Sequence, residues 1–487
     1  MLRRVLLSLL LVLLVVAVAP AQETPPAGGD AAPVTSVTPV AEEKPPEDEK
    51  GPNLQPPPWM SPAQKSQLEA ATKVWEDAYA AYSKEGATAA RAKVDAAVVA
   101  LTEAKKLDAR CAIPDHYLGI AYQLTGEFDK AIERLREAVR KNSQFHEAMV
   151  ELGDAYRWAD KDADAARTYD QAIATKPDYA HAYKMRALLR VAKEQLTEAR
   201  ADLARARELK PSDTELDSID ARLALVLEGP PWENKFTCET KNYVVWTNAN
   251  QGLADEIANH AELIRKLYTQ IFPRPPKAKR KFPIVVFSTR QEYHQNGGPA
   301  GAGGHFDPAF KQLFLFRYEQ MSDTLLVLYH EGFHQFLDSI LPGVHAPQWF
   351  NEGMADFFGP SQYFKQTKQQ GGEEGMRLRP NPWRLDTVQQ MIRADRTTDF
   401  EKLMTMTQQE MYEPEAAGLH YAQAWSMIYF LAQADNGAYF DYLKEYFQAL
   451  RRGKNIRETY EATFGRADMG AMQTRWREFT LGLQGSR

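Results

Sequence analysis

The chain has 487 residues, of which 44% are apolar and 25% charged, and its formal net charge is −6. This length exceeds what one hydrophobic core usually supports, so we expect two or more domains. The slightly acidic balance argues against nucleic acid or an acidic membrane surface as a partner, because neither attracts a protein of net negative charge.

The N-terminus has the pattern of a secretory signal peptide over residues 1–21. A basic start, MLRR, precedes an apolar run from Val5 to Val18 that is too short to span a bilayer comfortably, and the small residues of APA follow it. An uncleaved N-terminal anchor is the alternative. We predict an exported bacterial protein, periplasmic or secreted, with no stable membrane span after cleavage.

Residues 22–60 are rich in Pro, Glu, Ala and Gly and contain few large apolar side chains. Such a composition cannot bury enough surface to offset the entropy lost on ordering. The segment is predicted to be a disordered, partly extended tether.

Ala-rich helical sequence begins near Ser61, and three segments starting at Tyr117, Glu151 and Met185 then align at a period of 34 residues. Small residues coincide at three aligned places: Gly119, Gly153 and Ala187; Ala131, Ala165 and Ala199; Ala138, Ala172 and Ala206. This pattern resembles tetratricopeptide repeats, in which small residues allow two helices to cross closely. The resemblance implies an all-α solenoid over 61–228, with a degenerate hairpin over 61–111 and a closing helix after Pro211.

Repeat arrays of this kind bind extended peptides or partner helices in a concave groove. The side chains expected on that groove are mixed in charge: His116, Gln123, Glu147, Asp154, Arg157, His181 and Lys184. They identify no ligand. A protein partner in the groove and packing of the groove on the next domain are both open.

Residues 229–235, GPPWENK, are predicted to link two domains. Beyond them NYVVWTN, FPIVVFS and KQLFLFRY have the β-branched and aromatic content of strands, with a helix expected from about Leu253 to Phe272. The chain is then mainly helical to its end. Strands followed by helices predict an α+β domain over 236–487.

The stretch LLVLYHEGFHQFLD places His330 and His334 four residues apart. On an α-helix these positions share one face, one turn apart, so both imidazoles can reach one ion at about 2.0–2.1 Å. Ser322 with Asp323 is the expected helix start. Glu331 lies about 100° from His330 round the helix axis, a position that suits a general base rather than a third ligand.

A catalytic zinc ion needs a third protein ligand, and Glu352 in NEGMAD is the candidate. Asp356, one turn further along the same helix face, is positioned to accept the outer N–H of a ligating histidine. One zinc ion is therefore the predicted cofactor. Histidines satisfied by ordinary partners in a core are the alternative.

HEGFH followed by NEGMAD resembles the gluzincin zinc metallopeptidases of thermolysin type, and more closely the peptidase MA-like domains of secreted bacterial proteins. The resemblance extends over about 235–482. It implies a zincin-like fold with zinc held by His330, His334 and Glu352, with Glu331 as base and with Asp356 orienting a ligand.

The same resemblance implies a Tyr or His that stabilises the oxyanion. Tyr421 is the first candidate and His420 the alternative, with His305 and His345 as further candidates. It also implies that an edge strand near the metal holds substrate by backbone pairing, and KQLFLFRY is expected to be that strand.

Taken together, the patterns predict a multidomain protein with an N-terminal all-α tetratricopeptide solenoid and an α+β zincin-like metallopeptidase domain. The predicted activity is cleavage of peptide bonds by zinc-activated water, with repeats that bind a protein partner or the substrate. Two alternatives stay open: a repeat-based binding or scaffold protein with a catalytically silent metal domain, and a hydrolase of a non-peptide amide. The two cysteines, Cys111 and Cys238, fall in different predicted domains and are expected to be unpaired.

Overall fold

The computed structural model describes residues 52–344, 346–365, 374–413 and 416–484. These residues form two compact units, 52–223 and 224–484. The predicted signal peptide and the predicted tether up to residue 51 lie outside the described residues. Within the described ranges, no helix combines the length and apolar character that crossing a membrane requires.

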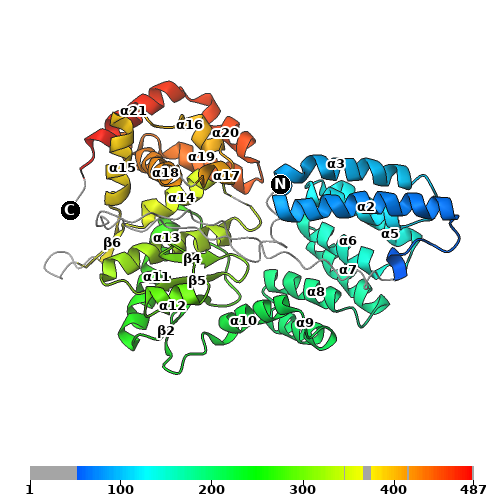
Figure 1. The fold of residues 1–487 in the computed structure, drawn as a ribbon. Helices are drawn as coiled ribbons and strands as arrows, with labels where there is room; N and C mark the ends of the chain where they lie inside the picture. Colours follow the sequence, from blue (N-terminus) through cyan, green and yellow to red (C-terminus); the bar gives the residue numbers. More distant parts are fainter. Residues whose placement is uncertain (1–51, 345, 366–373, 414–415, 485–487) are drawn as a thin grey trace, which may run out of the picture. The chain divides into compact units, whose positions relative to one another are not determined.

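The first unit is a series of helical hairpins (Figure 1). Its helices are α2 (Pro62–Glu85), α3 (Ala87–Ala104), α4 (Ile113–Leu124), α5 (Phe128–Lys141), α6 (His146–Trp158), α7 (Asp162–Thr175), α8 (Ala180–Ala192), α9 (Leu196–Leu209) and α10 (Thr214–Glu228). Successive pairs from α2 to α9 pack together, each pair packs on the next, and α10 follows the last pair. The expected N-terminal hairpin and closing helix are both present, and the two units divide within α10.

Small residues at the helix crossings explain the repeat period. A Cβ atom on Gly119 would lie 2.3 Å from Leu135 Cγ, and one on Gly153 would lie 2.4 Å from Tyr169 Cε1. Real side chains do not approach so closely, so these glycines let the two helices of a hairpin pack together.

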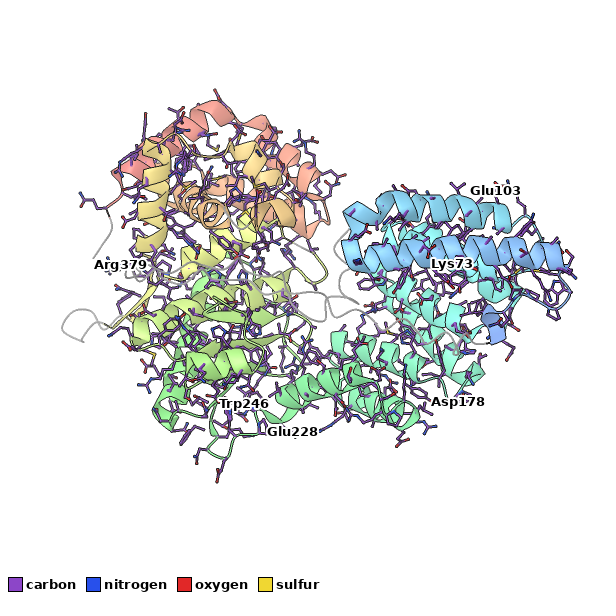
Figure 2. The ribbon with its side chains drawn as sticks, in the orientation of Figure 1. Lys73, Glu103, Asp178, Glu228, Trp246 and Arg379 are labelled. Carbon is purple, nitrogen blue, oxygen red and sulfur yellow. The ribbon has the colours of Figure 1, made fainter. Side chains whose placement is uncertain are left out.

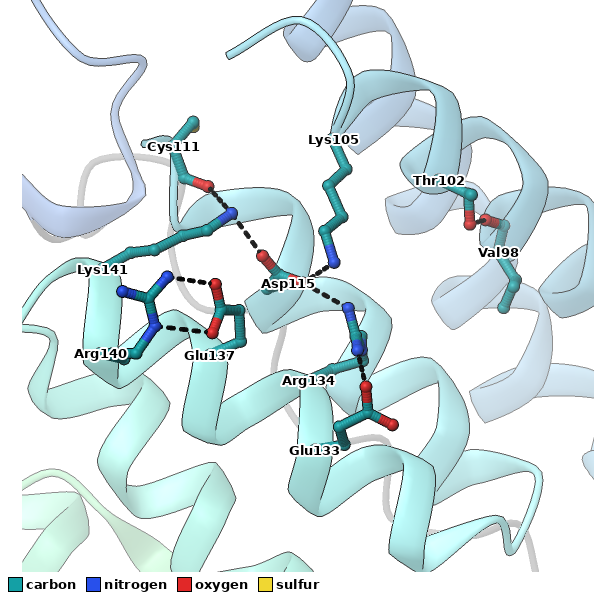
Figure 3. Close-up of polar contacts among 10 residues, drawn as sticks. All are labelled: Val98, Thr102, Lys105, Cys111, Asp115, Glu133, Arg134, Glu137, Arg140 and Lys141. Atoms are coloured by element: carbon teal, nitrogen blue, oxygen red, sulfur yellow. Dashed lines mark hydrogen bonds and ion pairs between the residues drawn. The ribbon is translucent and has the colours of Figure 1, made fainter. Parts of the chain in front are cut away.

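Asp115 on α4 is a fully buried carboxylate at the start of the repeats (Figure 3). It contacts Lys105 Nζ at 2.9 Å, Arg134 Nη1 at 3.2 Å and Lys141 Nζ at 2.7 Å. These cations come from α5 and from the residue that follows α3. A buried carboxylate requires such partners, and here they connect three helices.

The predicted tether over 22–60 is wrong at its C-terminal end. Pro52–Leu54 form the 3-10 helix η2, and the Asn53 amide donates to Gln144 O at 3.1 Å and to Glu147 Oε2 at 2.9 Å. Met60 is buried in the repeat core. These contacts are made with residues about 90 positions away, so local composition could not indicate them.

The second unit begins with a five-stranded mixed sheet in the order β1-β2-β3-β5-β4. The strands are β1 (Phe236–Glu239), β2 (Tyr243–Thr247), β3 (Phe282–Phe287), β4 (Gly304–Asp307) and β5 (Gln312–Phe316). The three central strands β2, β3 and β5 are parallel, whereas β1 and β4 run antiparallel at the two edges. A separate hairpin, β6 (Gln362–Lys365) with β7 (Glu374–Arg377), follows later.

In the second unit, some helices cover the sheet and the others form the C-terminal part of the unit (Figure 1). They are α11 (Gln251–Ile271), α12 (Arg290–Gln295), α13 (Met321–Ile340), α14 (Gln348–Phe358), α15 (Pro382–Arg393), α16 (Phe400–Thr405), α17 (Gln408–Met411), α18 (Ala417–Gln433), α19 (Phe440–Arg451), α20 (Ile456–Thr463) and α21 (Met469–Gly482), with 3-10 turns η4 (Ala434–Gly437) and η5 (Phe464–Arg466).

Alternate side chains of the strands enter two cores, as the period of a strand requires. Ile284 and Val286 pack with α11 and α13 in the main core, whereas Val285 and Phe287 pack on the other face with Trp246. Trp246 is labelled in Figure 2. Helix α13 contacts β4, β5, α11 and α14, so it lies between the sheet and the C-terminal helices.

Two local predictions about this unit are wrong. KQLFLFRY forms β5, which lies between β3 and β4 and is therefore not an edge strand. The edge on this side of the sheet is β4, a strand of only four residues within a Gly-rich segment. Helix α13 begins at Met321 after Gln320, which makes no side-chain cap, so Ser322 does not cap it.

Candidate metal centre

Helices α13 and α14 bring the three predicted ligands together. His330 and His334 are one turn apart on α13, with ring centroids 4.9 Å apart. Glu352 on α14 places its Oε2 atom 3.5 Å from His330 Nε2 and 3.6 Å from His334 Nε2. All three side chains are buried, and their ligand atoms lie within 4.8 Å of one another.

The two distances from Glu352 Oε2 to the histidine nitrogens suit a tetrahedral metal ion. Two atoms bound about 2.0–2.1 Å from one tetrahedral ion lie about 3.3 Å apart, close to the distances from Glu352 Oε2 to the two histidines. His330 Nε2, His334 Nε2 and Glu352 Oε2 are buried and lack hydrogen-bond partners among the described residues. Buried polar atoms without partners are costly, and a shared cation would satisfy all three.

The close approach of α14 to its neighbour positions Glu352. A Cβ atom on Gly353 would lie 2.8 Å from the backbone oxygen of Ala424 in α18. Only glycine permits this contact, so the Gly of NEGMAD allows α14 to rest directly on α18 while Glu352 faces α13.

Both histidines have an oxygen atom close to the nitrogen that faces away from the cluster, as a hydrogen bond for His334 and as an ion-pair contact for His330. His330 Nδ1 lies 3.2 Å from Asp356 Oδ1, and His334 Nδ1 lies 2.9 Å from Asn351 Oδ1. Arg384 Nε donates to the other oxygen of Asp356 at 2.7 Å. An acceptor at Nδ1 favours the tautomer whose Nε2 lone pair faces the metal.

Glu331 is completely buried beside the ligands. A Cβ atom on Gly304 of β4 would lie 3.3 Å from Glu331 Cγ, and the backbone of Phe306 also faces the carboxylate. Burial raises the pKa of Glu331 to about 8, His330 opposes this rise, and Glu352 adds to it. In the metal-free site the Glu331 carboxyl therefore holds its proton to a higher pH than an exposed glutamate does.

The ligand histidines differ in their electrostatics. Burial lowers the pKa of His330, but its contacts with Asp356 and Glu352 outweigh burial and raise the pKa to about 10. Burial lowers the pKa of His334. Burial opposes ionisation of Asp356 as well, yet Arg384 and His330 hold the pKa of this carboxyl below its ordinary value.

Tyr412, just after α17, is a site residue that the sequence analysis missed. Its hydroxyl donates to Glu352 Oε1 at 2.9 Å and lies 2.9 Å from Gln348 Oε1. Asn351 and Arg384 were missed as well. Asn351 stands next to Glu352 in NEGMAD, a signal that was available, whereas no motif marks Tyr412 or Arg384.

The predicted oxyanion candidates lie in different surroundings. Tyr421 on α18 is buried, with its ring 6.1 Å from that of Tyr412 and 5.2 Å from the Arg384 guanidinium. His420 is buried, with Nδ1 3.3 Å from Met411 O. His305 on β4 stacks on Phe314. His345 lies outside the described residues.

Comparison with known proteins assigns the first unit. Residues 123–189 match a family described as Tetratricopeptide repeat, in agreement with the hairpins and their crossing glycines. The first unit is a helical solenoid of tetratricopeptide-like hairpins, and the match to the family itself covers residues 123–189. Residues 325–450, which contain all of the predicted metal-site residues, match a family described as Protein of unknown function (DUF1570). None of the curated proteins matches the chain.

Tetratricopeptide proteins and MamA proteins are among the solved structures that are similar to the chain. The first tetratricopeptide domain of Spaghetti (RPAP3) bound to an HSP90 peptide is 26% identical, with 25% of this chain and 95% of that chain covered and a TM-score of 0.24. The thermophilic tetratricopeptide protein TTC0263 of Thermus thermophilus is 19% identical, with coverages of 34% and 84% and a TM-score of 0.28. A MamA structure is 22% identical, with coverages of 31% and 88% and a TM-score of 0.25.

Proposed function

We propose that the second unit is a zinc metallopeptidase of gluzincin type with a zincin-like fold. The observation that carries the proposal is the convergence of three buried, unpartnered donor atoms, His330 Nε2, His334 Nε2 and Glu352 Oε2, beside the buried carboxylate of Glu331. This donor set suits zinc, and a site with only three protein ligands leaves a position for substrate or water.

When bound, a zinc ion supplies a Lewis acid that polarises the peptide carbonyl and makes water more acidic. Glu331 takes a proton from the attacking water and later gives it to the leaving amine. Asp356 and Asn351 fix the tautomers of the two histidines, and Tyr412 occupies Oε1 of Glu352, so that Oε2 remains directed at the cluster.

Tyr421 is the proposed residue for stabilising the oxyanion, because its hydroxyl is buried and has no hydrogen-bond partner among the described residues. The hydroxyl of Tyr412 already donates its only proton to the ligand carboxylate of Glu352, so it has none to offer an oxyanion. Tyr421 is almost fully buried and packs beside Tyr412 and Arg384. A hydroxyl that donates a hydrogen bond to the developing negative charge lowers the barrier for acyl transfer.

The edge strand β4 is the proposed platform for substrate. It lies against Glu331 through Gly304, and among the described strands only β5 pairs with it, on one of its two sides. An extended peptide that pairs with the open side of β4 would place its backbone beside the base. The tetratricopeptide array is proposed to bind a protein partner or the protein substrate, as repeat arrays commonly do.

The test is cleavage of a peptide library by the purified full chain, read by mass spectrometry. We expect cleavage that a chelator abolishes and that one equivalent of zinc restores. Zinc bound at one per chain without cleavage of any peptide would instead favour the silent binding protein. Chelator-sensitive hydrolysis of non-peptide amides alone would favour the other alternative.

A further inference from the structure

The second unit also has an open cavity of about 460 Å³ apart from the metal centre. It is bordered by the first turns of α13, the end of α14 with β6, His260 of α11, and the segment from Arg379 to Trp383 that leads into α15. Arg379 is labelled in Figure 2. This volume falls within the range of small-ligand sites.

The cavity lies on a different side of α13 from the proposed catalytic base. Ser322, Leu325 and Tyr329 line the cavity, whereas Val327 and Glu331 face β4. At about 100° per residue, Leu325 is about 160° round the helix from Val327, and so is Tyr329 from Glu331. A ligand in this cavity would therefore not occupy the space beside Glu331.

Polar groups in the lining lack partners. Ser361 is 7% exposed and its Oγ atom has no hydrogen-bond partner in the part of the chain that the structure describes. Arg379 Nε is also buried and unpartnered in those residues. Buried donors of this kind are rare unless a ligand or water satisfies them.

Aromatic rings at the same cavity are exposed to solvent. Trp383 is 45% exposed and Tyr363 is 39% exposed. Most large apolar side chains of the described residues are buried, so two exposed rings at one cavity indicate a surface that a partner covers. An aromatic ring offers a flat apolar face to a ligand.

The charges of the lining favour a neutral ligand. Asp323 and Arg379 contribute one charge of each sign. Burial lowers the pKa of His260, which therefore stays neutral near pH 7. The lining thus has no surplus charge that would select an anion or a cation.

We propose that this cavity binds a neutral carbohydrate. Sugar hydroxyls both donate and accept hydrogen bonds, so they suit Ser361 and the Arg379 donor together with the Asp323 acceptor. The apolar C–H faces of a sugar ring suit the exposed rings of Trp383 and Tyr363. An apolar peptide side chain would leave Ser361 and Arg379 without partners. The inference is independent of the proposed peptidase activity.

The test is titration of the full chain with neutral oligosaccharides, followed by tryptophan fluorescence and calorimetry. A panel of cellotetraose, maltotetraose, mannotetraose and chitotetraose covers the common linkages. We expect at least one to bind, and Trp383→Ala and Tyr363→Ala each to weaken binding by about tenfold, the loss of one aromatic contact. Ser361→Ala should weaken binding of the same sugar several-fold, as expected for the loss of one hydrogen bond.

Two controls make the outcome decisive. Trp59→Ala removes an exposed tryptophan of the first unit, 54% exposed, and should leave binding unchanged. Glu331→Gln should also leave it unchanged, which separates this inference from the proposed catalysis. The inference is overturned if no sugar of the panel binds at about 10 mM, if binding survives both aromatic substitutions, or if only short peptides perturb Trp383.

Discussion

At the residue scale, each proposed ligand is held by a contact on its outer side. Asp356 contacts Nδ1 of His330, Asn351 contacts Nδ1 of His334, and Tyr412 donates to Oε1 of Glu352. These contacts leave His330 Nε2, His334 Nε2 and Glu352 Oε2 directed at one another. The protein therefore orients the donors before any cation arrives, which reduces the entropy lost on binding.

Asp356→Asn tests this orientation. The substitution removes the charge that pairs with His330 and Arg384, so zinc affinity should fall by roughly 10–100-fold. A competitive zinc titration measures the change. Asp441→Asn, at an aspartate whose side chain is 80% exposed, is the matched control. Equal affinities of the two variants would remove Asp356 from the site.

The acidity of the site predicts how zinc binding depends on pH. Without a cation the pKa of His330 is raised to about 10 and that of Glu331 to about 8, so both groups hold a proton at pH 7. Zinc requires a neutral His330 imidazole and favours loss of the proton from the neighbouring Glu331, so zinc binding should release protons. The zinc affinity should therefore increase with pH, by up to about tenfold per pH unit for each proton released. Calorimetry in buffers of different ionisation enthalpy counts these protons.

The same raised pKa values predict how the stability of the zinc-free protein changes with pH. When the pKa of a group is higher in the folded protein than in the unfolded chain, the group favours folding most at pH values below its unfolded pKa. This contribution is lost as the pH rises to the folded pKa. His330 should therefore lose its contribution between about pH 6.5 and 10, and Glu331 between about pH 4.5 and 8. Zinc binding that releases no protons at pH 7 would contradict these assignments.

Much of the donor set could be predicted from the sequence, because helix periodicity determines which residues share a face. His330 and His334 lie on one face by spacing alone, and Asp356 follows Glu352 by one turn. Tyr412 and Arg384 reach the site through tertiary packing of segments 60 and 28 residues away from their partners. No local pattern encodes such contacts.

At the element scale, the repeat period was predictable because the three aligned hairpins have small residues at matching positions, two of them glycines at close helix crossings. Strand order was not predictable in the same way. The short strand β4 has only four residues within a Gly-rich segment, and its pairing with β5 makes it the edge beside Glu331. Pairing partners depend on the whole sheet, so KQLFLFRY was wrongly expected at the edge.

The buried carboxylate of Asp115 should be important for the first helices of the array. Asp115→Asn would leave Lys105, Arg134 and Lys141 without their shared anion, and Lys141 is almost fully buried. Removing one partner of a buried ion pair costs about 3–5 kcal/mol in the free energy of unfolding. Asp129→Asn, at an exposed aspartate that pairs with Lys161, should cost less than about 1 kcal/mol. Denaturant unfolding compares them, and equal losses would show that the Asp115 network adds no stability.

At the scale of the whole molecule, the two units have separate hydrophobic cores. The repeat core is built from apolar residues of the hairpins, whereas the proposed metal ligands belong to the second unit. Metal binding should therefore change the stability of the second unit and leave that of the repeat array unchanged.

A fragment of residues 52–228 should melt cooperatively, with the same midpoint in chelator and in zinc. In the full chain, zinc at about 1,000 times its Kd should stabilise the second unit by about 4 kcal/mol. Calorimetric melts of both proteins measure this difference. A fragment that is unfolded, or whose midpoint shifts with chelator, would show that the repeat array is not autonomous.

The most direct test of the proposed activity compares Glu331→Gln with the wild type at equal zinc occupancy. Glu331 lies beside the donor cluster without being one of its three ligands, so the variant should keep about one zinc ion per chain. It loses the carboxylate that accepts the proton of the attacking water, so peptide cleavage should fall by about 10²–10⁴-fold. Cleavage at the wild-type rate by the zinc-loaded variant would contradict the account.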